Sequence, residues 1–171
     1  MDTSTKLQHS SIFLSLFLIF LTACQQPAST IKQDGLLAEG IFIEWEVISN
    51  QIADEPRCRT LFRIENKSIQ VLGNQGWAIY YNQNANDVIP GTATNGISVT
   101  LLGGDFYCFA PEEGFQLSPG EKRSIEVDHR AWMIKEDQSP IGLYMVFYDK
   151  GGRERSRFPL KNFTVRPFTQ P

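Results

Sequence analysis

The chain has 171 residues, of which 42% are hydrophobic and 20% are charged, and its formal net charge is −3. This size and composition indicate one globular domain. Because 16 Lys and Arg residues are outnumbered by 19 Asp and Glu residues, the charge balance argues against a nucleic-acid partner. The only histidines are His9 and His129, so a Ser-His-Asp or Cys-His enzyme would depend on His129 once the N-terminal segment is removed.

Residues 1–23 are typical of a bacterial export signal. Lys6 precedes an apolar run over residues 12–21, which is too short to span a bilayer core about 30 Å thick. The segment ends in Leu21-Thr22-Ala23-Cys24, which resembles the bacterial lipobox, in which the Cys sulfur is acylated and becomes the new N-terminus. We therefore expect a lipid anchor at Cys24. The alternative is an ordinary signal peptide with an incidental cysteine.

Residues 24–39 are predicted to be a flexible tether between the lipid and the domain. The stretch over residues 25–30 is polar, small and broken by Pro27, so it cannot bury enough apolar surface to order itself. Gln25, standing where Asp would retain a lipoprotein in the inner membrane, favours the outer membrane by the usual bacterial sorting pattern. The protein is thus expected to be exported and anchored to a bacterial membrane.

Export also bears on the other two cysteines, because disulfides persist outside the cytoplasm. With Cys24 acylated, Cys58 and Cys108 remain as an even pair, and we expect a disulfide between them. Two reduced core thiols are the alternative.

Residues 40–171 are predicted to form an all-β domain, because β-branched and aromatic residues alternate with polar ones. In chain order, the expected strands cover residues 41–48, 58–65, 76–82, 97–101, 106–109, 124–128, 131–134, 143–148 and 163–165. Short strands at this spacing favour a β-sandwich of the immunoglobulin-like or carbohydrate-binding type. Cys58, Trp77 and Cys108 imitate the immunoglobulin framework, but Phe106 stands at the tyrosine-corner position, which argues against the antibody-like family itself.

An ordered series of short motifs resembles one known family. The motifs are Trp45-Glu46-Val47-Ile48-Ser49-Asn50, Phe62-Arg63-Ile64-Glu65-Asn66, Gly76-Trp77-Ala78-Ile79-Tyr80-Tyr81, Gly104-Asp105-Phe106-Tyr107, Ala110-Pro111, Phe115-Gln116-Leu117-Ser118-Pro119-Gly120-Glu121, Pro140-Ile141-Gly142-Leu143-Tyr144 and Asn162-Phe163-Thr164-Val165. Over roughly residues 40–168 the chain is similar to the N-terminal sandwich of bacterial chitobiases and β-N-acetylhexosaminidases of glycoside hydrolase family 20. The resemblance implies binding of chitin or other glycans that contain N-acetylglucosamine.

The activity of that family is not expected here. Its sandwich is followed by a small α/β domain and a catalytic barrel with an adjacent Asp-Glu pair, whereas this chain stops at Pro171. Glu112-Glu113 and Asp54-Glu55 are interpreted as solvated loop charge, and neither a metal-ligand spacing nor a phosphate-binding loop is present, so no cofactor is expected. The alternative function is a docking or structural domain for a separately encoded or truncated hexosaminidase.

Outward-facing tyrosines are the candidate sugar contacts, because the apolar faces of pyranose rings stack on aromatic rings. Strand parity places Trp45 and Trp77 in the core, and an inward Cys108 would turn its neighbour outward. The candidate set is Tyr80, Tyr107, Tyr144 and Tyr148. Surface tyrosines that bind nothing, or rings that dock a partner domain, are the alternatives.

Replacing Cys24→Ser is expected to move the protein from the membrane fraction to the soluble fraction, because the lipid is attached through the cysteine sulfur. Immunodetection after membrane fractionation measures the shift, and a Cys108→Ser variant, which keeps the anchor, should stay with the membranes. An unchanged distribution of the Cys24→Ser variant would contradict the lipid anchor.

Overall fold

The computed structural model describes residues 27–50, 55, 57–84, 88–130, 133 and 138–167. The expected export signal over residues 1–23 and the lipidation site Cys24 lie outside these residues. The chain divides into two compact units, Met1–Gln33 and Asp34–Pro171, and the described residues of the first unit, 27–33, are helical. No helix within the described ranges is long and apolar enough to cross a membrane.

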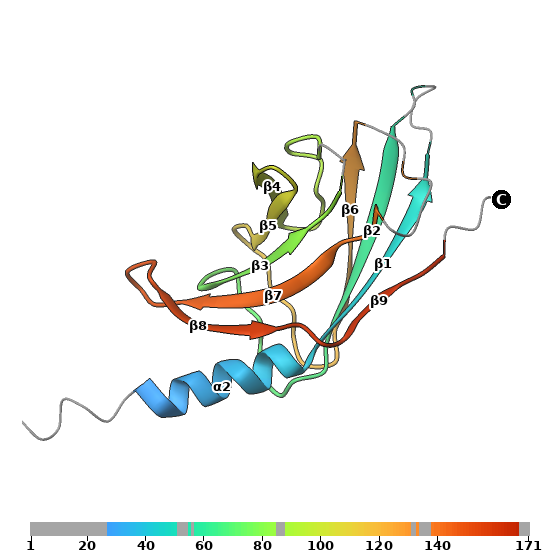
Figure 1. Ribbon diagram of the computed structural model, residues 1–171. Coiled ribbons are helices and arrows are strands. Elements are labelled where there is room, and N and C mark those ends of the chain that lie inside the picture. The colour runs from blue at the N-terminus through green and yellow to red at the C-terminus, as the bar shows by residue number, and fades with distance from the viewer. Residues whose placement is uncertain are drawn as a thin grey trace, which may run out of the picture. The chain divides into compact units, whose positions relative to one another are not determined.

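The second unit is a β-sandwich, as predicted, with two sheets of four and five strands (Figure 1). The four-stranded sheet has the order β6-β2-β1-β9, and the five-stranded sheet has the order β4-β5-β3-β7-β8. The elements are α2 (Pro27–Glu39), β1 (Ile41–Ser49), β2 (Cys58–Asn66), β3 (Trp77–Asn82), β4 (Ile97–Gly103), β5 (Phe106–Pro111), β6 (Lys122–His129), β7 (Ile141–Tyr148), β8 (Glu154–Pro159) and β9 (Phe163–Val165). The expected strand over residues 131–134 lies outside the described residues except for Met133.

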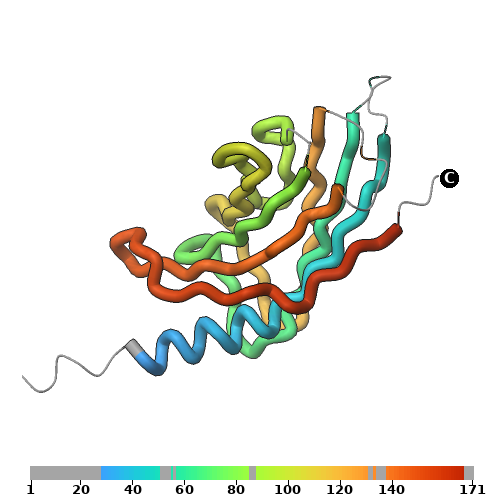
Figure 2. Tube along the Cα trace, viewed as in Figure 1, coloured from blue at the N-terminus to red at the C-terminus, as the bar shows by residue number. Residues whose placement is uncertain are grey.

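Among the strands that the structure describes, every pair is antiparallel except one. β9 runs parallel to β1, with Ile43 opposite Phe163 and Trp45 opposite Val165. Cyan β1 and red β9 accordingly lie side by side along the trace in Figure 2. The first strand of the sandwich is therefore held by its neighbour in sequence on one side and by the last strand on the other.

The core lies between the sheets, where alternate side chains of each strand face inward. Trp45 and Trp77 are both buried, as the strand parity predicts. Phe62 of β2 contacts two rings of the opposite sheet, Tyr81 at 5.9 Å and Phe109 at 5.5 Å between ring centroids. Tilted ring pairs at this spacing are favourable beyond the area they bury, and here they join the two sheets.

The predicted flexible tether over residues 24–39 is wrong for residues 27–39, which form α2. Within the second unit, Leu37 and Ala38 are buried, and Asp34 is only 6% exposed. The Asp34 carboxylate accepts hydrogen bonds from Arg155 Nε at 2.9 Å and Nη2 at 2.8 Å. Two apolar residues and one bidentate ion pair thus fix residues 34–39, which follow the polar stretch that suggested a tether.

The predicted disulfide between Cys58 and Cys108 is also wrong, since both thiols are free. Cys58 begins β2 and is fully buried opposite His129 of β6. Cys108 lies in the other sheet and is half-buried on its outer face, opposite Tyr80. A disulfide needs two Cβ atoms that face each other within about 4.5 Å, which side chains on these two surfaces do not provide.

Both thiols are expected to react with Ellman's reagent in the unfolded Cys24→Ser protein before any reduction. In the folded protein Cys58 should not react, because burial raises its pKa to about 12 and the thiolate is the reactive form. A Cys108→Ser variant should then show no reactive thiol until it unfolds. If no thiol reacts in denaturant without reductant, the two cysteines form a disulfide after all.

Asp34→Asn is expected to lower the free energy of unfolding by about 1–3 kcal/mol, because it removes the buried charge paired with Arg155. Urea denaturation measures the change. The matched control is Glu154→Gln, which breaks an exposed ion pair with Arg157 on the same strand and should have little effect. Equal effects of the two substitutions would contradict the importance of the buried pair.

Candidate functional site

Three aromatic rings gather on the outer face of the five-stranded sheet. Tyr80 on β3 is the middle one, with centroids 5.6 Å from Phe106 on β5 and 5.5 Å from Tyr144 on β7. The ring planes are nearly parallel, at 16° and 19°, and all three side chains are half-buried. We call Tyr80, Phe106 and Tyr144 the aromatic platform. Its three central strands hold the rings rigidly, since neighbouring positions on one sheet face are about 5 Å apart.

Hydrogen bonds connect the Tyr80 hydroxyl to two polar groups beside the platform. Tyr80 Oη and Tyr148 Oη share a hydrogen bond, and the Cys108 thiol also lies within hydrogen-bonding reach of Tyr80. Burial and the contact with Tyr148 raise the pKa of Tyr80 well above its ordinary value. The Tyr80 phenol therefore stays neutral, and a neutral phenol can both donate and accept hydrogen bonds.

Polar side chains border the platform on both sides. The Arg157 guanidinium of β8 lies 4.9 Å from the Tyr144 ring centroid and is itself held by Glu154 at 2.7 and 3.1 Å. Asn82 is exposed opposite Phe106, and Thr100 is exposed opposite Cys108. The platform therefore combines an apolar centre with hydrogen-bonding groups at its margin, which suits a ligand with apolar faces and polar edges.

The structure brings together three of the four predicted candidates, Tyr80, Tyr144 and Tyr148. The predicted outward position of Tyr107 is wrong, because this residue is 1% exposed and stacks on Tyr81 in the core at 5.4 Å. Cys108 faces outward, so the residues on either side of it face inward. Phe106 occupies the platform position in place of Tyr107 but was not predicted, because β5 is apolar on both faces and hydrophobic alternation does not fix its parity.

His129 lies in the core and does not face solvent. It is fully buried on β6, and its Nε2 is 3.0 Å from Thr60 Oγ1. Within the part of the chain that the structure describes, no cluster of three or more His, Cys, Asp or Glu side chains could hold a metal ion.

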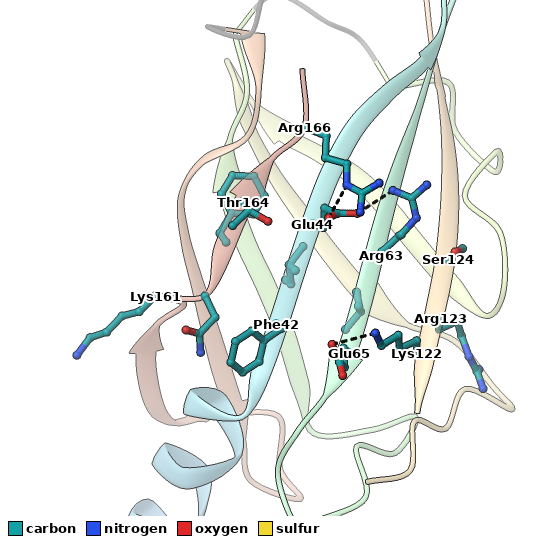
Figure 3. Close-up of a pocket in the computed structure, with 14 residues that line it drawn as sticks. Phe42, Glu44, Arg63, Glu65, Lys122, Arg123, Ser124, Lys161, Thr164 and Arg166 are labelled. Atoms are coloured by element: carbon teal, nitrogen blue, oxygen red, sulfur yellow. Dashed lines mark hydrogen bonds and ion pairs between the residues drawn. The ribbon is translucent and has the colours of Figure 1, made fainter. Parts of the chain in front are cut away.

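The outer face of the four-stranded sheet is charged instead of aromatic. Glu44 of β1 accepts hydrogen bonds from Arg63 Nη1 at 2.8 Å and lies 2.6 Å from Arg166 Nε. Although partial burial opposes it, contact with these two guanidinium groups holds the pKa of Glu44 below its ordinary value. Beside this network lies a hollow of about 530 Å³, shown in Figure 3 with its lining side chains from β1, β2, β6 and β9 and from the residues on either side of β9.

Comparison with known proteins supports one family and one fold. A family model described as "Putative carbohydrate binding domain" matches residues 43–152. No curated protein sequence matches the chain. An exo β-N-acetylglucosaminidase of glycoside hydrolase family 20 from Vibrio harveyi, solved with N-acetylglucosamine, is similar in structure with a TM-score of 0.56 and 20% sequence identity. The similarity covers 75% of this chain and 18% of that chain, and an inactive mutant of the same enzyme gives the same values.

The chitin-binding domain of Chi18aC from Streptomyces coelicolor is more distant. Its TM-score is 0.43 at 15% identity, over 67% of this chain and 94% of that chain. The Vibrio harveyi enzyme thus shares the fold of the sandwich, and the shared part is a small fraction of that enzyme's length.

Proposed function

The chain belongs to the carbohydrate-binding domain family whose model matches residues 43–152, and we propose that it binds chitin-type glycans on the aromatic platform without catalysis. The observation that carries the proposal is the nearly parallel stack of Tyr80, Phe106 and Tyr144 on an outer sheet face. The flat faces of N-acetylglucosamine rings carry apolar C–H groups, which pack on aromatic rings.

The surroundings of the platform suit an uncharged sugar. The neutral phenol of Tyr80 and the side chains of Asn82 and Thr100 can hydrogen-bond to hydroxyl and acetamido groups. N-acetylglucosamine is the sugar in the Vibrio harveyi structure, which guides the choice of ligand. Because an open sheet face buries little of a bound oligosaccharide, the expected dissociation constant is roughly 0.1–1 mM.

The second candidate function is docking to a hexosaminidase catalytic chain. It is favoured by the Vibrio harveyi enzyme, in which a domain of this fold is 18% of a much longer chain. Tyrosines and arginines are enriched at protein interfaces, and the platform with Arg157 has this composition. In either function, we propose that acylated Cys24 holds the domain at the surface of a bacterial membrane, most simply the outer membrane.

Phe106→Ala and Tyr144→Ala are each expected to weaken the binding of chitohexaose by about 1 kcal/mol or more, because each removes a stacking ring. Isothermal titration calorimetry measures the affinity, and circular dichroism checks that the fold is retained. Tyr144→Phe should keep most of the affinity, since the ring remains.

The control is Ile69→Ala, which removes an exposed apolar side chain from the segment between β2 and β3, outside the platform and the other sheet's outer face. It should leave chitohexaose binding unchanged. Binding that both platform variants retain would contradict the platform as the site. No binding at millimolar chitohexaose, together with a stable complex with a hexosaminidase catalytic chain, would favour the docking function.

A further inference from the structure

We propose that the hollow on the outer face of the four-stranded sheet is a second binding site, and that it takes a saccharide carrying carboxylate, sulfate or phosphate groups. We call this hollow the charged groove. The half-buried ring of Phe42 on β1 lines it, with Glu44, Arg63 and Arg166 grouped above this ring and Lys122 to one side of it in the view of Figure 3. This site is on the sheet opposite to the aromatic platform and does not depend on the proposed function.

The lining of the groove has more cations than anions, although the whole chain has a net charge of −3. Two carboxylates, Glu44 and Glu65, face five cationic side chains. The cations are Arg63, Lys122, Arg123, Lys161 and Arg166. Neighbours outside the lining reduce the excess without removing it. Glu46 pairs with Arg63 and Glu121 with Arg123, which adds two negative charges, and Lys67, which pairs with Glu65, adds one positive charge. A concentration of one sign of charge in a hollow attracts ligands of the opposite sign.

The groove also has unused hydrogen-bond donors, whereas the acceptors of Glu44 are occupied. Both oxygens of Glu44 are already used, one by Arg63 and the other by Arg166. A guanidinium group has five N–H donors, so Arg166 keeps donors that its contact with Glu44 does not use. Lys122 is 72% exposed and lies 3.5 Å from Glu65, which leaves its ammonium group accessible. The ligand must therefore supply acceptors, and oxyanions are the strongest acceptors for such donors.

The groove also has features that a bare anion would not use. Lys67 Nζ lies over the Phe42 ring, 4.0 Å from its centroid, so one more cation stands next to the aromatic side chain that lines the groove. The hydroxyl-bearing side chains of Ser124 and Thr164 are exposed at its margin. Figure 3 shows Lys161 and Arg123 extending away from the centre, where they would meet the ends of a longer ligand. A saccharide whose acidic substituents point toward Arg166 and Lys122 and whose ring lies beside Phe42 and Lys67 matches this arrangement.

The test uses hexagalacturonate as the acidic saccharide, chitohexaose as the uncharged one and sodium sulfate as the simple anion. Titrations of the Cys24→Ser protein are followed by calorimetry at about 20 mM and 300 mM NaCl. Hexagalacturonate should bind at low salt and weaken at high salt, because screening shortens the range of the attraction. Lys122→Gln and Arg166→Gln should each weaken binding roughly three- to tenfold. Glu44→Gln should strengthen it, because it removes a negative charge and releases donors of Arg63 and Arg166.

The matched control is Lys150→Gln, which removes one exposed lysine from the turn between β7 and β8. It should not change hexagalacturonate binding. Equal weakening by Lys150→Gln and Lys122→Gln would overturn the groove as the site, as would an absence of binding. Sulfate that binds as tightly as hexagalacturonate and displaces it would overturn the saccharide class. Tyr144→Ala should weaken the binding of chitohexaose and leave the binding of hexagalacturonate unchanged. The platform proposal and the groove proposal can therefore be rejected independently of each other.

Discussion

The contact of Phe62 with Tyr81 and Phe109 determines much of what this sandwich presents to solvent. These three rings join the two sheets near the middle of the core. Since side chains alternate between the two faces of a strand, every ring that is fixed inside fixes its neighbours outside. Inward Tyr81 directs Tyr80 to the outer face, and inward Phe109 does the same for Cys108. A slip by one residue in β3 or β5 would exchange core and surface, so the core contact strongly specifies the register.

The two outer faces that result are chemically different, although the strands share one core. On the five-stranded sheet, neighbouring aromatic residues cover one another and shield part of their apolar surface. On the four-stranded sheet, opposite charges alternate across strands, as in the run from Glu46 through Arg63 and Glu44 to Arg166. Cross-strand pairs of either kind stabilise a sheet modestly. A single domain therefore presents an aromatic surface on one sheet and a charged surface on the other.

Strand parity could be predicted from the sequence wherever one face is clearly apolar. Trp45 alternates with Glu44 and Glu46, and its burial follows from that pattern. In β5 no such contrast exists, because Phe106, Tyr107 and Phe109 are apolar on both faces. The predicted parity of β5 depended on the expected disulfide, which required Cys108 to face inward. An inward Cys108 places Tyr107 outside and Phe106 inside, so both residues were assigned to the wrong face.

Other misses have different causes. β8 has the sequence Glu-Arg-Ser-Arg-Phe-Pro and lies at a sheet edge, where backbone pairing with β7 does not require an apolar face. Helix α2 was not predicted because its buried apolar residues, Leu37 and Ala38, are too few to give the sequence a helical pattern of hydrophobic residues. The ion pair that holds its residues 34–39 joins Asp34 to Arg155, and no local sequence pattern reveals a contact over that separation. The charged groove likewise combines residues of β1 and β2 with residues of β6 and of the β9 region, which follow much later in the sequence.

The parallel pairing of β9 with β1 has a consequence for folding. β1 can pair with β2 as soon as both have left the ribosome, but Ile43 meets Phe163 only after nearly the whole domain has been made. Until then one edge of β1 exposes unsatisfied backbone groups, and such an edge can pair with another chain. Contacts this distant in sequence also slow folding, because a long loop must close first. Holding the nascent chain unfolded or shielded until β9 emerges would protect this edge from intermolecular pairing.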